Sequence, residues 1–538
     1  MRELRCRIKD YIQPFERVLA LKELTALSGD SPKSVCDSDG GVVEFTVETT
    51  RSASGLASQL AYWEQVSTKA RSLVTDQSLR ESTVNVVRNG IDLAALRETL
   101  PFTNEVPLPN RRCLRYGTHG IHEYRGKFFP QLVRSLINIS GTKAGGIVVD
   151  PMSGSGTTVV EAALVGCAGY GLDMNPLSTF LGGVKCELLS ADPARLASAY
   201  KNIRKRLLEP EAHGRSKLKY LASLPEADQS YLRDWFAEEV LAGLDDIALA
   251  IKNVRYGPAA NMMWVALSNV LRSVSWQKNE DLRVRKDVRL DVEIDPKKEF
   301  LEELGRSVRA VLAFLYQEGH APKYRPVVAA GDARASSNHL SDLRGKVDVV
   351  ITSPPYATAL PYLDTDRLSL CYLGLLPRPE HRTRDQLMIG NREVSERTRL
   401  AYLERLHLEG GLLPPSIRKL IARIEQLNKG TEAGFRRKNL PALLAKYFFD
   451  MRDVLGSILD LLKDGSYAFV VVGNNHTMAG GKRVDIQTAG LLAEIASSLG
   501  FEVQPSLSMD MLASRDIFRK NAMATEEILF LRKPVSQR

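Results

Sequence analysis

Short apolar runs in the middle and at the end of the chain have the length of strands that are buried on both faces. They cover residues 146–150, 168–173, 326–330, 347–351, 466–472 and 527–531. Segments with helical apolar spacing lie between several of these runs, including 161–166, 442–462 and 488–499. Buried strands that alternate with helices predict one doubly wound α/β sheet.

Two long segments interrupt this alternation. Residues 187–322 have a mostly helical pattern with a charged stretch at 277–291. Residues 377–440 hold 14 Lys/Arg and 8 Asp/Glu, a local net charge of +6 (14 − 8). We therefore expect a doubly wound sheet with two largely helical insertions, the second of which is basic.

Residues 1–105 precede this region and predict an α+β appendage of unknown role. Helical spacing covers 8–28 and 55–73, while residues 43–48 alternate as a strand does. Three prolines at 101–112 are typical of a linker. The expected divisions are the appendage at 1–105, the first half of the sheet domain at 113–186, a mainly helical insertion at 187–325, the second half of the sheet domain at 326–376, a basic insertion at 377–440, and the last strands at 441–538.

Bulk properties narrow the class of protein. A chain of 538 residues is long enough for about two to four domains. Its net charge of +9 favours a polyanionic partner, although a mildly basic enzyme explains the charge almost as well. No apolar run has the length of a membrane span, and the N-terminus lacks a signal-peptide pattern. We therefore expect a cytoplasmic protein that makes no contact with a membrane.

The cysteines and histidines show no metal-binding pattern. The six cysteines are scattered without a CxxC pair, which indicates neither a zinc site nor a disulfide framework. His119 and His122 are close in sequence, but no cluster of carboxylates or cysteines supports a metal there. We expect no metal site.

A loop rich in glycine, serine and threonine follows the first predicted strand, at residues 150–158. Gly154 and Gly156 allow the backbone to approach a ligand, and the next helix offers free N–H groups. A P-loop would require a lysine near its end, and a dinucleotide fingerprint would require glycine in place of Val159. The pattern that remains favours a nucleoside-type cofactor whose carboxylate end contacts the loop.

Two acids follow the next strands. Asp173 lies 17 residues after Gly156, where folds of this kind place a carboxylate that binds ribose. The alternative is a helix cap ahead of Asn175-Pro176. Asp332 and Ala333 follow strand 326–330 and come within reach of an adenine amino group if the sheet forms. A plain turn is the alternative there.

Strand 347–351 ends in Thr352-Ser353-Pro354-Pro355-Tyr356. The two prolines have fixed φ angles and no N–H groups, so the loop offers carbonyl and hydroxyl acceptors beside an aromatic ring. This suits a planar substrate with an NH2 group, such as a nucleobase. Most Pro-Pro loops are only turns, but the glycine loop and the two acids lie at the same carboxyl edge, where doubly wound sheets bind ligands.

Together these motifs resemble those of the S-adenosylmethionine-dependent DNA amino-methyltransferases, the N4-cytosine/N6-adenine group. Residues 150–158 resemble the family's cofactor loop, with Met152 at a position that is commonly Phe. Residues 353–356 resemble its catalytic motif in the Ser-Pro-Pro-Tyr form of N4-cytosine enzymes. Residues 119–132 resemble the cofactor-side motif that precedes the sheet, and 465–475, 500–501 and 526–533 resemble the last strands of the same domain. The resemblance covers about 115–186, 325–376 and 442–533.

This resemblance implies a Rossmann-like class I methyltransferase sheet and S-adenosyl-L-methionine as the cofactor. It assigns cofactor binding to Lys127, Phe128, Asp150, Met152, Gly154, Gly156, Thr157, Thr158, Asp173, Asp332 and Ala333. It assigns catalysis to Ser353, Pro354, Pro355 and Tyr356.

The implied reaction transfers a methyl group from a sulfonium to an exocyclic amine of a flipped-out base. Ser353 Oγ and the Pro354 carbonyl would accept the two amine hydrogens, so that the nitrogen lone pair faces the methyl group, and Tyr356 would stack on the base. No covalent nucleophile is needed, and none of the six cysteines follows a proline. Positioning and electrostatics would supply most of the rate.

The expected partner is double-stranded DNA, together with a possible restriction or defence protein. Flanking contacts must offset the cost of base flipping. Candidates for these contacts are Arg272, Arg283, Arg285, Lys286 and Arg289 in one insertion and Arg436, Arg437 and Lys438 in the other, and a solvated helix face explains each group equally well. After the catalytic loop, Asp364, Asp366 and Arg367 either hold the loop or pair with one another.

Two alternatives stay open. The target could be N6 of adenine in DNA, or a base in RNA, because Ser353 in place of Asp is the main argument for cytosine. The chain could also be an inactive DNA-binding specificity or scaffold subunit. Intact residues at Asp150, Gly154, Gly156 and Asp173 argue against that second alternative.

Overall fold

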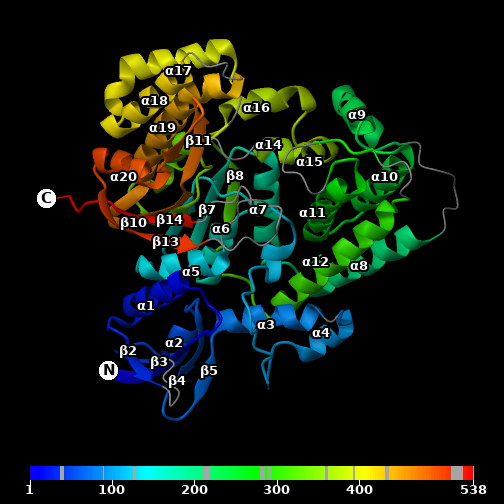
Figure 1. The fold of residues 1–538 in the computed structure, drawn as a ribbon. Helices are drawn as coiled ribbons and strands as arrows, with labels where there is room; N and C mark the ends of the chain where they lie inside the picture. Colours follow the sequence, from blue (N-terminus) through cyan, green and yellow to red (C-terminus); the bar gives the residue numbers. More distant parts are fainter. Residues whose placement is uncertain are drawn as a thin grey trace.

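A computed structural model describes the protein and shows a central sheet with helical layers around it (Figure 1). The described residues are all of 1–538 except 37–41, 89, 104, 125–128, 210–217, 279–284, 289–292, 358–361, 392–393, 430–434, 511–524 and 537–538. Within this described part, no helix has both the length and the apolar character that a membrane span requires.

The central sheet has seven strands in the order β13-β14-β10-β9-β6-β7-β8. From β8 to β10 neighbouring strands are parallel, whereas β14 runs antiparallel to both β10 and β13. The strands are β6 Ile147–Asp150, β7 Ala168–Asp173, β8 Val327–Ala330, β9 Val347–Thr352, β10 Leu462–Gly473, β13 Glu502–Asp510 and β14 Thr525–Arg532. The chain moves outward from β6 to β8, then returns beside β6 and moves outward again from β9. The predicted doubly wound α/β sheet is confirmed.

Alternate residues of the central strands face two different cores. Val148 and Ile351 pack in a cluster with helices α1 (Pro14–Ser28) and α5 (Pro130–Ile139). Val149 and Val350 pack in a second cluster with α19 (Phe435–Leu461) and α20 (Thr488–Ser498). All four valine and isoleucine side chains are fully buried. Because both faces of the sheet are covered, the sequences of these strands are continuous apolar runs.

The N-terminal segment forms its own antiparallel sheet in the order β2-β3-β1-β4-β5. Its strands are β1 Arg2–Ile8, β2 Lys33–Cys36, β3 Val42–Thr49, β4 Trp63–Ser67 and β5 Ser72–Val74. The strand predicted at 43–48 is confirmed within β3. The helix predicted at 55–73 is wrong, because only α2 (Ala53–Ala57) is helical and β4 and β5 follow it. Buried Val66 of β4 pairs with buried Cys6 of β1, and this tertiary pairing outweighs the local helical spacing.

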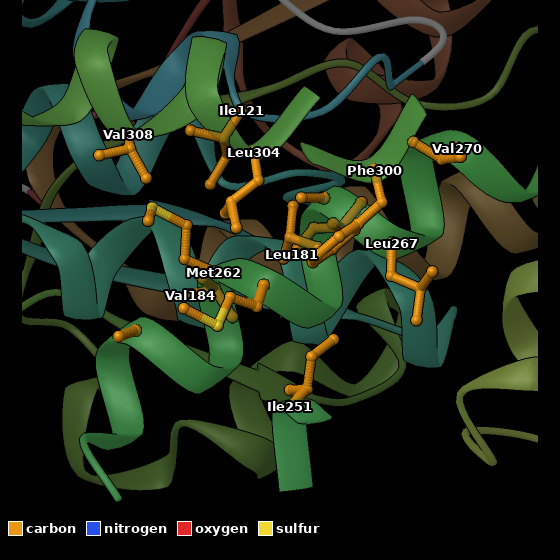
Figure 2. Packing of buried hydrophobic residues seen from close by; sticks show 14 of the residues in the cluster. Ile121, Leu181, Val184, Ile251, Met262, Leu267, Val270, Phe300, Leu304 and Val308 are labelled. Atoms are coloured by element: carbon orange, nitrogen blue, oxygen red, sulfur yellow. The ribbon is translucent and has the colours of Figure 1, made fainter. Parts of the chain in front are cut away.

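The first insertion is mostly helical, as predicted. Its long helices are α8 Pro193–Leu208, α9 Glu226–Arg233, α10 Glu238–Lys252, α11 Gly257–Val274 and α12 Pro296–Glu318. Figure 2 shows Met262 and Leu267 of α11 and Phe300 of α12 packed around Leu181 of α7 (Pro176–Leu188). The insertion therefore extends a core that begins at the sheet. The N-terminal helices α3 (Asp76–Arg88) and α4 (Leu93–Thr99) also pack against α12.

The second insertion contributes α16 His381–Leu387, α17 Glu396–Glu409, α18 Pro415–Asn428 and the first turns of α19. Ile417, Ile421 and Ile424 of α18 are buried in the cluster that covers one face of the central sheet. A hairpin of β11 (Asn475–Ala479) and β12 (Lys482–Ile486) contacts α18. The remaining helices are α6 Thr157–Leu164, α13 Ser336–His339, α14 Tyr362–Thr365 and α15 Arg367–Tyr372.

Candidate active site

A pocket opens where β6, β7, β8 and β9 end and where β14 begins. It is lined by Tyr124, Pro151, Met152, Gly154, Asp173, Met174, Gly331, Ala333, Ser353, Pro355, Tyr356, Met388, Ile389 and Glu526. The ends of parallel strands meet at one edge of the sheet, so segments far apart in sequence converge there. Of the residues proposed from sequence, the pocket brings together Met152, Gly154, Asp173, Ala333, Ser353, Pro355 and Tyr356.

The glycine loop after β6 requires glycine at two positions. Gly154 has φ +48° and Gly156 has φ +82°, conformations that L side chains rarely adopt. A Cβ on Gly154 would lie 3.0 Å from the ring of Tyr124, and one on Gly156 would lie 3.0 Å from the Cα of Gly182. The first glycine therefore keeps the pocket wall open, and the second lets the start of α6 pack against α7.

Asp150 lies beneath the pocket rather than in its wall. Its Oδ1 accepts hydrogen bonds from Thr352 Oγ1 at 2.7 Å and from Met152 N at 3.1 Å. Its Oδ2 accepts one from Thr158 Oγ1 at 2.7 Å. Burial raises the pKa of Asp150 to about 6, against the lowering effect of these bonds. The side chain joins β6, β9 and the start of α6, and Thr157 is likewise buried behind the loop.

Asp173 faces the pocket with a partly buried carboxylate. Its Oδ2 accepts a hydrogen bond from Gly154 N at 2.8 Å, and its Oδ1 accepts one from Asn175 N at 2.8 Å. Removal from solvent raises the pKa of Asp173 to about 6, against these backbone bonds. The cap of α7 is Asn175, whose side chain accepts from Leu177 N at 3.0 Å. The helix-cap alternative for Asp173 is therefore wrong.

The Ser-Pro-Pro-Tyr loop leaves β9 at the switch point of the sheet. Ser353, Pro355 and Tyr356 line the pocket, whereas Pro354 is buried. The Tyr356 hydroxyl donates a hydrogen bond to Glu526 Oε1. Burial raises the pKa of Glu526, and the bond from Tyr356 opposes that rise. The Tyr356 ring and hydroxyl, the Glu526 carboxylate and the Ser353 side chain therefore lie in the same pocket.

One predicted cofactor residue, Asp332, lies in other surroundings than expected, and two are not described. The Asp332 carboxylate pairs with Arg334, whose Nη2 lies 2.6 Å from Oδ2, and the neighbours of Asp332 line the pocket in its place. Lys127 and Phe128 lie outside the described residues.

The acids after the catalytic loop have different partners. Arg367 pairs with Asp364 at 2.6 Å, as the pairing alternative expects. Asp366 instead accepts a hydrogen bond from Asn175 Nδ2 at 2.8 Å. This hydrogen bond between Asp366 and Asn175 connects the segment after the catalytic loop with the segment after β7.

Seven pocket residues were not assigned to the site from sequence: Tyr124, Pro151, Met174, Gly331, Met388, Ile389 and Glu526. Met174 follows the predicted Asp173, so its position was a usable signal. Pro151 and Gly331 also adjoin predicted residues, and Tyr124 and Glu526 lie in the family-like segments 119–132 and 526–533. Met388 and Ile389 come from the basic insertion, where no local motif marks them. Lys185 was also missed, because its burial, which calls for a specific partner, is visible only in the structure. Its Nζ donates to Ser155 Oγ of the glycine loop at 2.9 Å.

The histidines near the loop serve the structure. His119 Nε2 lies 2.9 Å from Glu161 Oε1, and Arg134 Nε lies 2.9 Å from Glu161 Oε2. Burial alone would raise the pKa of Glu161, but Arg134 and His119 lower it to about 2. His122 Nε2 lies 3.1 Å from Ser268 Oγ. No group of His, Cys, Asp or Glu among the described residues could hold a metal ion.

Comparisons with known proteins found similarity to a methyltransferase family, to methyltransferases and to solved structures. Residues 122–206 match a family model described as UPF0020, the RMKL-like methyltransferase domain. The type II methyltransferase M.MvaI of Kocuria varians is 24% identical over 397 residues, 70% of this chain and 80% of that protein. The type II methyltransferase M.BsoBI of Geobacillus stearothermophilus is 24% identical over 449 residues, 76% of this chain and 84% of that protein. Among solved structures, TrmN from Thermus thermophilus is 12% identical over 99% of each chain, with a TM-score of 0.31.

The fold is that of class I Rossmann-like methyltransferases, and the protein is a methyltransferase. Its cofactor is S-adenosyl-L-methionine. The pocket suits this group, because an open glycine loop and the Asp173 carboxylate face the same space. The relatives that match most of the chain are type II methyltransferases.

Proposed function

We propose that the protein methylates the exocyclic N4 of cytosine in DNA, on a base turned out of the helix. The observation that carries this proposal is the shared pocket of Ser353, Tyr356 and Asp173. In it, the candidate base-binding loop and the candidate cofactor carboxylate line the same space. The similarity to type II methyltransferases supports DNA as the substrate.

The roles of the chain's own residues follow from their chemistry. An exocyclic amine is a poor nucleophile, because its lone pair is delocalised into the ring. Ser353 Oγ and the Pro354 carbonyl would accept its two hydrogens and free that lone pair, and the Tyr356 ring would stack on the base. Met152, Gly154 and Asp173 would hold the cofactor, which supplies an electrophilic methyl group when bound. Water exclusion and fixed acceptors would then supply most of the rate.

Contacts to the flanking DNA are proposed for both insertions. Arg285, Lys286, Arg437 and Lys438 are exposed, and their charges suit phosphate groups. Arg272 is partly buried and donates to the carbonyl of Lys278. Arg283, Arg289 and the side chain of Arg436 lie outside the described residues. We further propose action in the cytoplasm on nucleoid DNA, in restriction-modification or a related defence, with a possible nuclease partner.

Nucleoside analysis tests the proposal directly. The protein would be expressed in a host that lacks DNA methylation, and the DNA digested to nucleosides for mass spectrometry. We expect N4-methylcytosine in DNA from these cells and none in DNA from cells that express the Pro354→Ala variant.

Each other outcome selects a different function. N6-methyladenine without N4-methylcytosine would assign the protein to adenine. Methylated bases in RNA alone would move the activity to RNA. Cofactor binding without any modified nucleic acid would favour the specificity or scaffold subunit.

A further inference from the structure

Residues 387–391, which we call the strap, leave the end of α16 and run along one side of the pocket. Met388 and Ile389 of the strap line the pocket together with Gly331, Ala333 and Tyr356. The sequence places the strap in the basic insertion, the segment for which DNA contact was the expected role. Its position instead puts part of that insertion beside the candidate cofactor and base sites.

Two buried or half-buried cations hold the first part of the strap. Arg334 Nη2 donates to the carbonyl of Leu387 at 3.0 Å. Lys446 Nζ donates to the carbonyl of Met388 at 2.9 Å. Both cations share Asp450, at 3.0 Å from Arg334 Nη1 and 2.6 Å from Lys446 Nζ. With Asp332, which also pairs with Arg334, the cluster has two cations and two anions.

A balanced cluster of this kind fixes backbone position. Its charges are satisfied by one another, and each cation still donates to one strap carbonyl. Because Arg334 follows Ala333 directly, the cluster fixes Met388 next to the segment that follows β8. Asp332 does not line the pocket itself and acts on the pocket wall through its ion pair with Arg334.

The last part of the strap touches the catalytic loop. Gly390 has φ +74°, a conformation that favours glycine. A Cβ at Gly390 would lie 3.0 Å from Pro355 Cβ and 3.1 Å from the carbonyl oxygen of Tyr356. The strap therefore extends from the end of β8 to the loop after β9, and a side chain at Gly390 would push that loop away.

Two side chains of the strap pack in two different hydrophobic clusters. Met388 packs at the edge of the cluster formed by the helical insertion, and Ile389 is buried in the cluster of α19 and the sheet. The apolar side chains of Met388, Ile389 and Ala333 in the pocket wall suit the flat faces of a purine ring. Leu387 has an exposed side chain and does not line the pocket, so only its carbonyl takes part.

We propose that the strap completes the cofactor pocket: Met388 and Ile389 contact the adenosine part of S-adenosylmethionine, and Arg334 positions them. This inference rests on the proposed function for the identity of the ligand. It adds that the second insertion is required for cofactor binding, and that Gly390 joins the cofactor site to the base site.

Titration calorimetry with S-adenosylmethionine and S-adenosylhomocysteine tests the proposal. Met388→Ala and Ile389→Ala should each raise Kd by about tenfold, because apolar contact with the ligand is lost. Leu387→Ala is the matched control on the same strap and should leave Kd unchanged. Arg334→Gln should raise Kd as Met388→Ala does, and Arg334→Lys should recover part of the affinity.

The second part of the test separates the two ends of the strap. Gly390→Ala should lower kcat on DNA while the cofactor Kd stays within about twofold, because its Cβ meets the catalytic loop. Thermal melting of every variant checks the fold, and Met388→Leu replaces Met388→Ala if the latter melts early. If Met388→Leu has a Kd close to that of the wild type, the result supports contact between Met388 and the ligand. If Met388→Leu loses as much affinity as Met388→Ala, the result contradicts that contact.

The outcomes also separate this inference from the proposed function. A wild-type protein that binds neither ligand would overturn the proposed function. A wild-type protein that binds, with unchanged Kd in the Met388→Ala and Ile389→Ala variants, would overturn the strap alone.

Discussion

Thr352 Oγ1 donates a hydrogen bond of 2.7 Å to Asp150 Oδ1, and both side chains are buried. The two residues are 202 positions apart in sequence and end the neighbouring strands β9 and β6. The glycine loop starts from one of them and the Ser-Pro-Pro-Tyr loop from the other. Their bond therefore fixes the distance between the candidate cofactor site and the candidate base site.

Thr352→Val tests this bond. Valine keeps the shape of threonine but leaves Asp150 with one fewer donor in a buried place. The free energy of unfolding should fall by about 1–3 kcal/mol, because Asp150 Oδ1 then keeps only its bond from Met152 N in a buried place. Urea denaturation measures the change. Thr352→Ser keeps the hydroxyl and is the matched control, and a loss as large as that of valine would show that the hydrogen bond contributes little.

Much of the sheet and of two pocket walls could be predicted because their signals are local. An apolar run ends in Asp150 and a second ends in Asp173, and each run is short enough to be only a strand. The glycines and prolines that follow restrict the backbone within a few residues. These features need no knowledge of distant contacts.

The rest of the pocket depends on tertiary register, which no local pattern carries. Glu526 reaches the pocket because β14 is antiparallel to β10 and pairs Glu526 with Gly473 at the carboxyl edge. Met388 arrives there because Arg334 and Lys446 hold the strap carbonyls. The wrong helix at 55–73 has the same cause, since β4 forms through its pairing with β1 and β5.

The affinity for the cofactor should depend on pH through Asp173. Removal from solvent raises the pKa of this carboxyl to about 6 in the unliganded protein. An ionised carboxylate accepts hydrogen bonds from ribose hydroxyls more strongly than a neutral one. Affinity should therefore rise as pH increases from 5 to 7, by at most about tenfold per unit, and level off above that range. Calorimetric titration across this range measures it.

The control for this prediction is Asp173→Asn, which cannot ionise. Its affinity should be weaker than that of the wild type at pH 7 and nearly independent of pH. A wild-type affinity that is flat between pH 5 and 7.5 would mean that Asp173 does not contact the cofactor as an anion.

The bond between Tyr356 and Glu526 should matter for turnover more than for cofactor binding. Tyr356→Ala removes the stacking ring and should abolish methyl transfer. Tyr356→Phe keeps the ring but loses the hydroxyl that Glu526 accepts. It should lower kcat severalfold, because the ring is held less firmly, with a cofactor Kd close to that of the wild type.

A double-mutant cycle identifies the partner. If Glu526 acts through the Tyr356 hydroxyl, Glu526→Gln should cost little, since the amide oxygen still accepts the bond. Glu526→Ala should then lower kcat in the wild type but hardly at all in the Tyr356→Phe background. Additive losses would instead assign Glu526 a separate contact, either to the base or to the loop.

Glu23 should make the stability of the whole protein depend on pH. It is fully buried in α1, accepts a hydrogen bond from Asn138 Nδ2 of α5 at 2.9 Å, and accepts another from Ala61 N at 3.1 Å. Burial raises its pKa from 4.5 to about 7, against these bonds. The folded state therefore binds more protons than the unfolded state between these two values. The stability that Glu23 contributes is complete below pH 4.5 and is lost as pH rises through 7.

Urea denaturation at pH 5, 6 and 7 should show this decline in the wild type. Glu23→Gln cannot titrate, and its amide oxygen still accepts the bond from Ala61 N. The slope of stability against pH should therefore be shallower in the variant by on the order of 1 kcal/mol per pH unit. Other groups titrate equally in both proteins, so the difference isolates Glu23. Parallel slopes would mean that Glu23 is ionised in the folded protein throughout this range, with its hydrogen bonds outweighing burial.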